Sequence, residues 1–206
     1  VGHSRAVSAF CISPSGKHFG SASADKTARI WPFASREASP GHQILTHDAE
    51  VLALGFADAD DHLVTLDAAR TVRLWSLHAT HWQLQSVLSR DVGRMSLSQS
   101  GAVAWTVQGA HTVCCIDTRT GEVKAQLTSD LVADAVFASP SGIEALVTSS
   151  DGSAEITQLT PTTRTALAGH TGRILDACLV ERQGQKLWLT ASEDATARVW
   201  TSSGIP

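Results

Sequence analysis

The residue types of a hydrolytic triad occur twice in this chain at similar spacing. Each set combines an imidazole, a hydroxyl, a carboxylate and an indole side chain. The sets are His3, Ser21, Asp25 and Trp31, and His170, Thr190, Asp194 and Trp200. A hydroxyl, an imidazole and a carboxylate in one network can form a nucleophile for acyl transfer. That chemistry also needs an oxyanion site, often beside a G-x-S-x-G turn, and the sequence contains no such turn. The duplication and this lack favour a structural role.

Both sets belong to a repeat that extends along the whole chain. Ser21–Trp31 and Thr190–Trp200 each read as strand, tight turn, strand, and each follows a Gly-His pair. The position of the Trp recurs every 41 to 44 residues, at Trp31, Trp75, Ile116, Thr157 and Trp200. We call it the tryptophan position. Residues 1–206 therefore divide into five units, at about 1–45, 46–88, 89–127, 128–167 and 168–206.

A Gly-His start and an S-x-D-x-T-x-R-x-W finish resemble the WD40 repeat, whose units of about 40–45 residues form four-stranded propeller blades. The resemblance implies an all-β fold of antiparallel sheets. It also implies that the two sets are structural tetrads, in which Trp donates to the hydroxyl, the hydroxyl to His, and His to Asp. Propellers of this family usually close with seven blades. We therefore expect five visible blades of a larger ring or of one that a partner completes, and a five-bladed ring remains an alternative.

The first unit shows the pattern of strands that we expect in each unit. Its strands are predicted at Val7–Ile12, His18–Ser23, Thr27–Phe33 and Gln43–Leu45, with a polar loop at Ser35–Gly41. The first turn, Ser13-Pro14-Ser15-Gly16, is echoed by Ser139-Pro140-Ser141-Gly142, and Gly suits a positive φ there. The fifth unit is predicted to have three strands.

The middle units lose the tetrad by degrees. The second keeps His47, Thr65 and Trp75 but has Ala69 at the Asp position. The third retains only the hydroxyl of Thr106. The fourth retains Asp151 but has Val147 where the other units have a hydroxyl. Packing is therefore expected to hold the middle units together.

The composition excludes several classes of protein. Of 206 residues, 43% are hydrophobic and 17% charged, which is typical of a globular chain. A net charge of −4 without a basic stripe argues against direct nucleic-acid binding, and no apolar run is long enough for a membrane span. The cysteines, Cys11, Cys114, Cys115 and Cys178, lack C-x-x-C spacing, so we expect buried free thiols and no metal site or other cofactor. Such thiols, without a signal peptide, indicate an intracellular protein, cytoplasmic or nuclear and not secreted.

The leading functional hypothesis is a non-catalytic protein–protein interaction scaffold that holds several proteins in one complex. The alternative is a regulatory propeller domain attached to a larger enzyme or ribonucleoprotein subunit. Loops beside the Gly-His positions offer Arg5, Glu50 and Arg173 as candidate partner-binding residues. Trp82 opens a predicted outer strand and is expected to be partly exposed, which suits an interface. Arg29, Arg73 and Arg198 share one strand position and are expected to form surface salt bridges.

A serine-directed fluorophosphonate probe distinguishes a structural Ser21 from a catalytic one. We expect no labelling of Ser21, because an activated nucleophile needs an oxyanion site beside it. A known serine hydrolase serves as the positive control, with mass spectrometry as the readout. Labelling of the native chain that disappears in a Ser21→Ala variant would contradict the structural role.

Overall fold

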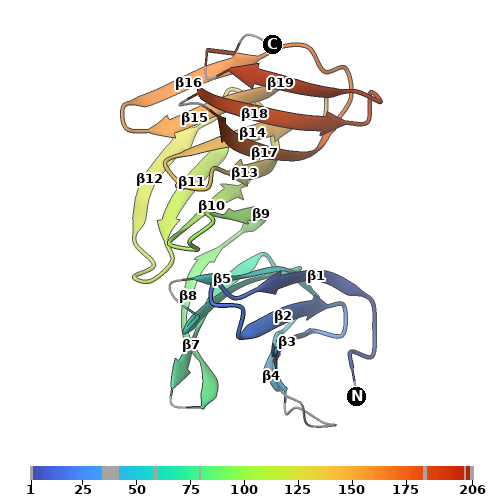
Figure 1. Cartoon of the computed structure of the whole chain (residues 1–206), viewed down its shortest axis with the longest axis vertical. Coiled ribbons are helices and arrows are strands. Elements are labelled where there is room, and N and C mark those ends of the chain that lie inside the picture. Colours follow the sequence, from blue (N-terminus) through green and yellow to red (C-terminus); the bar gives the residue numbers. More distant parts are fainter. Residues whose placement is uncertain are drawn as a thin grey trace. The chain divides into compact units, whose positions relative to one another are not determined.

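The computed structural model describes residues 2–33, 42–57, 60–78, 80–182, 185–201 and 203–204. Every regular element in these ranges is a β-strand, which confirms the predicted all-β class (Figure 1). In this part of the chain no helix is long and apolar enough to cross a membrane. The predicted loop at Ser35–Gly41 lies outside the described residues.

Consecutive strands pair antiparallel within each sheet. In the described ranges they form five sheets, four with four strands and the fifth with three. The first two sheets contain β1 (Val7–Ile12), β2 (His18–Ser23), β3 (Thr27–Pro32) and β4 (Gln43–Thr46), then β5 (Val51–Ala57), β6 (His62–Asp67), β7 (Thr71–His78) and β8 (His81–Arg90). The third contains β9 (Val92–Leu97), β10 (Val103–Gln108), β11 (Thr112–Asp117) and β12 (Val123–Thr128). The last two contain β13 (Ala133–Ala138), β14 (Glu144–Ser149), β15 (Ala154–Leu159) and β16 (Thr162–Leu167), then β17 (Ile174–Arg182), β18 (Gln185–Ser192) and β19 (Ala197–Thr201).

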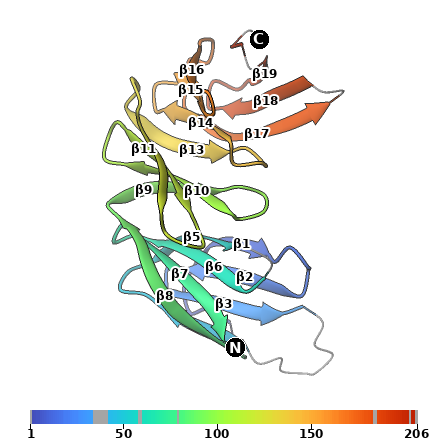
Figure 2. The same ribbon diagram turned by 90° about the vertical axis from the view of Figure 1, so that its left-hand side faces the viewer.

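The chain divides into two compact parts, which we call the N-terminal part and the C-terminal part to distinguish them from the five sequence units. The first holds the first two sheets with residues 100–102 and 117–122, and the second comprises residues 93–99, 103–116 and 123–206. In the N-terminal part, β1 and β2 lie beside β5 (Figures 1 and 2). In the C-terminal part, β13 contacts both β10 and β17.

Tight turns join the first two strands of a sheet where the sequence predicted them. Gly16 and Gly142 adopt φ of 72° and 74°, a region that L side chains rarely occupy. In each case the glycine N–H donates to the carbonyl of the residue three positions earlier, Ser13 at 2.8 Å or Ser139 at 2.9 Å. The repeated Ser-Pro-Ser-Gly motif therefore forms the same turn twice.

Each sheet has two faces because side chains alternate along a strand. We call the face that carries the tryptophan position the tetrad face. In the N-terminal part, the tetrad face of the second sheet packs on the opposite face of the first sheet. The shared core contains Leu63 and Trp75 from the second sheet and Ala22, Ala28 and Ile30 from the first.

The C-terminal part repeats this arrangement. Trp188 and Trp200 on the tetrad face of the fifth sheet pack with Leu146 and Ile156 on the opposite face of the fourth. A fully buried side chain of this size contributes about 1.5–3 kcal/mol, so these layers supply much of the stability. Both Trp188 and Trp105 are 0% exposed.

Candidate functional site

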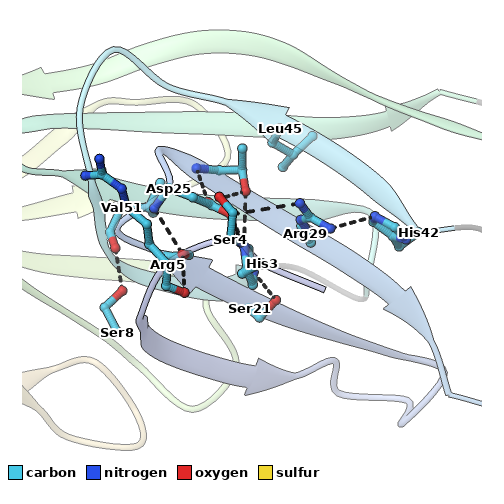
Figure 3. A network of polar contacts seen from close by, with 12 residues as sticks. His3, Ser4, Arg5, Ser8, Ser21, Asp25, Arg29, His42, Leu45 and Val51 are labelled. Carbon is cyan, nitrogen blue, oxygen red and sulfur yellow. Dashed lines mark hydrogen bonds and ion pairs between the residues drawn. The ribbon is translucent and has the colours of Figure 1, made fainter. Parts of the chain in front are cut away.

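The complete tetrad of the first sheet is a chain of hydrogen bonds that starts at Trp31. Trp31 Nε1 donates to Ser21 Oγ at 3.0 Å, and Ser21 Oγ lies 2.8 Å from His3 Nε2. His3 Nδ1 lies 2.9 Å from Asp25 Oδ2 (Figure 3). An indole N–H can only donate, so the Ser21 proton points to Nε2 and the Nδ1 proton to the carboxylate. Both imidazole nitrogens are thereby engaged.

Asp25 is fixed by more donors than the tetrad pattern names. Its Oδ1 accepts the Thr27 hydroxyl at 2.6 Å and the Thr27 N–H at 3.0 Å. Its Oδ2 also accepts the Ser4 N–H at 3.0 Å (Figure 3). Burial raises the pKa of Asp25, but the bonds from Thr27, Ser4 and His3 outweigh it and hold that pKa well below the ordinary value. The carboxylate is thus a permanent acceptor. The S-x-D-x-T motif contains Thr27, but the sequence pattern alone does not assign it this contact with Asp25.

The fifth sheet reproduces this geometry closely. Trp200 Nε1 donates to Thr190 Oγ1 at 2.9 Å, and that oxygen lies 2.8 Å from His170 Nε2. His170 Nδ1 lies 2.7 Å from Asp194 Oδ2, and the Thr196 hydroxyl donates to Asp194 Oδ1 at 2.6 Å. The hydrogen bond from Thr196 is the main reason that the pKa of Asp194 lies well below its ordinary value. The structure therefore brings both predicted sets together.

The second sheet keeps three members and finds a substitute for the fourth. Trp75 Nε1 donates to Thr65 Oγ1 at 2.9 Å, which lies 2.8 Å from His47 Nε2. The other nitrogen, Nδ1, lies 3.1 Å from the backbone carbonyl of Leu45. Burial, with the nearby Arg73 charge, lowers the pKa of His47 to about 4. The ring is therefore a neutral structural group.

The arginines at the shared strand position differ in burial: Arg29 and Arg198 are half-buried, whereas Arg73 is buried. Arg73 is 8% exposed and contacts the buried carboxylate of Asp67 and, at 2.5 Å, Asp48. Arg29 donates to His42 Nε2 at 3.0 Å and lies 3.9 Å from Asp25 (Figure 3). The surface assignment is wrong for Arg73, because the neighbouring carboxylates satisfy its charge inside the fold.

The third and fourth sheets lack the network. Thr106 donates instead to a backbone carbonyl of β11 at 3.5 Å. Val147 is 0% exposed, and the hydroxyl of Thr157 is buried without a hydrogen-bond partner in the described part of the chain. Asp151 accepts the Ser153 N–H at 2.9 Å in its own turn. Apolar packing holds these sheets, as the sequence predicted.

The candidate partner-binding residues occupy different environments. Arg5 and Glu50 are exposed. Arg173 is half-buried, and its Nε donates to Asp134 Oδ2 at 2.6 Å. The expected partial exposure of Trp82 is wrong, because its indole is 8% exposed and packs edge-on against Phe56.

A groove in the C-terminal part adds residues that the sequence did not single out. It measures about 310 Å³ and runs across the first strands of three sheets, β9, β13 and β17. Its lining comprises Arg94, Met95, Ala135, Val136, Phe137, Arg173, Ile174 and Leu175. Arg94 is exposed, and no hydrogen bond or ion pair is found for it among the residues described. A positive charge beside apolar side chains suits an acidic, partly apolar ligand.

The described ranges contain no group of three or more His, Cys, Asp or Glu side chains arranged to hold a metal ion. Cys114 and Cys115 are buried as expected, whereas Cys178 is exposed on the opposite face of the fifth sheet. The expectation of a buried thiol is therefore wrong for Cys178, because nothing in this part of the chain covers that face.

Substitutions at Trp200 measure what the tetrad contributes to stability. Trp200 is 1% exposed, so Trp200→Ala should lower the free energy of unfolding by about 3–5 kcal/mol. Trp200→Phe keeps most of the packing but removes the donor to Thr190, and should cost about 1–2 kcal/mol. Trp31→Ala should cost less than Trp200→Ala, because Trp31 is only half-buried. Urea unfolding measures all three, and a native-like Trp200→Ala would refute the assignment.

The pH dependence of stability should report the buried His47. Its folded pKa of about 4 lies below the ordinary value of about 6.5, so the unfolded chain binds a proton first as the pH falls. Stability should therefore be flat above about pH 6.5 and fall by about 2 kcal/mol at pH 5. The lowered pKa of His42 adds a loss of the same sign. Asp25 and Asp194, whose pKa values are depressed, should add losses only below about pH 4.

Urea unfolding at pH 7 and pH 5 checks this, with His47→Gln as the control. The variant should be less stable at pH 7 but have a shallower slope. An unchanged slope in His47→Gln would show that other groups cause the loss.

Comparisons with known proteins agree with the geometry. The family model for the WD domain, G-beta repeat (WD40) matches residues 1–32, which contain the first tetrad. Transducin beta-like protein 3 of Rattus norvegicus is 27% identical over 214 residues, which is 96% of this chain and 26% of the relative. The chain thus spans about a quarter of the length of the curated relative that it matches. The match of residues 1–32 to the WD40 model and the similarity to this relative support the expected resemblance to the WD40 repeat, and the repeated sheets and tetrads are consistent with it.

Proposed function

We propose that this chain is a non-catalytic scaffold that binds several protein partners, one of them through the groove across β9, β13 and β17. WD40 repeats generally mediate protein–protein interaction. The observation that carries the proposal is Arg94, an exposed guanidinium without a partner in the described residues, on the wall of a groove with apolar lining. Arginine flanked by apolar side chains is typical of the residues that dominate binding energy at interfaces.

The groove favours a partner segment that carries acidic and apolar side chains. Arg173 is already paired with Asp134, so it shapes the wall, whereas Arg94 is available for a carboxylate. Phe137 and Leu175 line the same groove, and Leu175 is 58% exposed. A segment that alternates acidic and apolar residues would use both features.

The tetrads support a non-catalytic role. In each complete tetrad the hydroxyl accepts the indole proton, and both imidazole nitrogens have partners. The Asp accepts at least four hydrogen bonds in each case, which fixes its charge. These groups stiffen the hairpin between the second and third strands, and the surrounding surface is then free to bind partners.

Quantitative affinity purification with mass spectrometry tests the proposal. Arg94→Glu should lower the recovery of a subset of partners at least fivefold, because it reverses the charge available to a carboxylate. The matched control is Arg182→Glu, at an exposed position outside the groove lining, which should keep the full set. Both variants should melt like the native chain.

Two results would contradict this function. Recovery of the same partners at the same level by all three chains would rule out the groove. Recovery of no specific partner by the native chain would rule out the scaffold itself. A fluorescent peptide that alternates glutamate with leucine gives a direct measurement, and its affinity should fall about tenfold with Arg94→Glu.

A further inference from the structure

We infer that Asp134 sets the ligand specificity of the groove across β9, β13 and β17, so that the groove accepts a segment with a carboxylate side chain and disfavours a phosphorylated one. In this inference Asp134 is a positioning residue, because it acts through Arg173. The inference rests on the proposed function, which requires only that Arg94 binds an acidic segment. It adds which kind of acidic side chain the partner segment carries.

The charged groups of the groove leave one positive charge uncompensated. Arg94 and Arg173 both line it, and Arg173 Nε donates to Asp134 Oδ2 at 2.6 Å. The Asp134 carboxylate therefore cancels the charge of Arg173, whereas Arg94 has no ion pair in the described part of the chain. A single carboxylate on a bound segment would neutralise the charge that remains.

A β-bulge places Asp134 beside Arg173. The strands β1, β5, β13 and β17 each show a shift of register at their second residue. A bulge leaves this residue out of the ladder and re-aims its side chain. The residues at this position are Ser8, Leu52, Asp134 and Leu175, and of these four Asp134 is the charged one. The carboxylate at the groove is therefore a feature of the fourth sheet and not a requirement of the bulge.

Backbone hydrogen bonds anchor the chain at both members of the pair. The Arg173 carbonyl accepts the Glu193 N–H at 2.9 Å, from the turn between β18 and β19. The N–H of Ala133, next to Asp134, donates to the Ala110 carbonyl at 2.7 Å. With both backbones held, Arg173 would have to give up its bond to Asp134 in order to turn toward a ligand. The pair therefore keeps Arg173 occupied.

A phosphorylated side chain fits this pattern of charge poorly. At neutral pH a phosphoserine carries a charge of about −1.5 to −2, more than the single charge of a glutamate. Arg94 can balance one negative charge, so the excess would lie near the Asp134 carboxylate. Salt screens a charge over about 8 Å at physiological ionic strength, so in a groove of about 310 Å³ the repulsion is only partly screened. Such repulsion is a means of rejecting the wrong ligand.

Removal of the Asp134 charge should reverse the preference. Asp134→Asn keeps an oxygen that can accept from Arg173 Nε, but the charge of Arg173 is then uncompensated. A phosphate would be balanced by two guanidinium groups, which bind phosphate strongly. The side chains of Arg173 and Asp134 are 35% and 28% exposed, so the substitution should change stability little.

Fluorescence anisotropy with three short peptides tests the inference. In each peptide, leucines flank one variable position, which is glutamate, phosphoserine or serine. The native chain should bind the glutamate peptide about fivefold more tightly than either of the others. Asp134→Asn should bind the phosphoserine peptide about tenfold more tightly than the native chain does, whereas its affinity for the glutamate peptide should change by less than about threefold.

A double variant shows whether Asp134 acts through Arg173. Asp134→Asn combined with Arg173→Gln leaves the charge of Arg94 alone, so it should regain the native preference for glutamate. Asp130→Asn is the matched control, because it makes the same change at a side chain that is 88% exposed and outside the groove lining. It should bind all three peptides like the native chain. Circular dichroism verifies that each variant is folded.

Three outcomes would overturn the inference and leave the proposed function standing. They are native binding of the phosphoserine peptide as tight as that of the glutamate peptide, an unchanged preference in Asp134→Asn, and a preference for phosphoserine that persists in the double variant. A native chain that binds the glutamate peptide no better than the serine peptide would overturn both the inference and the proposed function.

Discussion

The hydrogen-bond chain from Trp through a hydroxyl and His to Asp is the interaction that fixes the geometry of the first and fifth sheets, and the other sheets are built around its partial or complete loss. It ties three segments together: the third strand through Trp31, the second through Ser21, and the residues before the first strand through His3. Each polar group is removed from water, and leaving one unpaired would cost about 1–3 kcal/mol. The network therefore tolerates few rearrangements and sets the geometry of the hairpin.

Loss of the network is compensated differently in each sheet. In the second, a backbone carbonyl replaces the missing carboxylate at His47, and Arg73 forms a separate buried pair with Asp67. In the fourth, Val147 replaces the hydroxyl, and its burial contributes through packing. A polar network and an apolar contact thus occupy equivalent positions because both fill the interior, although the buried hydroxyl of Thr157 in the fourth sheet has no hydrogen-bond partner in the described chain.

The alternation of side chains gives every sheet two unlike faces, and this difference governs how sheets join. Faces that carry Trp75 or Trp200 pack on faces of smaller aliphatic side chains. Gly20 shows how close the approach is, because a Cβ there would lie 2.8 Å from Leu54 Cδ1. In the described chain the tetrad face of the first sheet and the opposite face of the fifth carry exposed apolar side chains, among them Phe10 and Val199.

The sequence by itself determined the strands, the turns and the members of both tetrads. Local patterns carry this information: alternation defines the strands, Gly16 permits the turn, and a period of 41 to 44 residues places the partners of Trp31 and Trp200. The bounds of β1 and β2 agree with the predicted ones, and β3 and β4 each differ from the prediction by one residue at one end.

The tertiary structure decided which side chains are buried. Trp82 and Arg73 have the types and positions of surface residues, but the layer packed on their strands removes them from water. Cys178 and Val199 have the types of core residues but remain exposed because no layer of the described chain covers them. Burial depends on what lies across a face, and a strand's own sequence does not contain that neighbour.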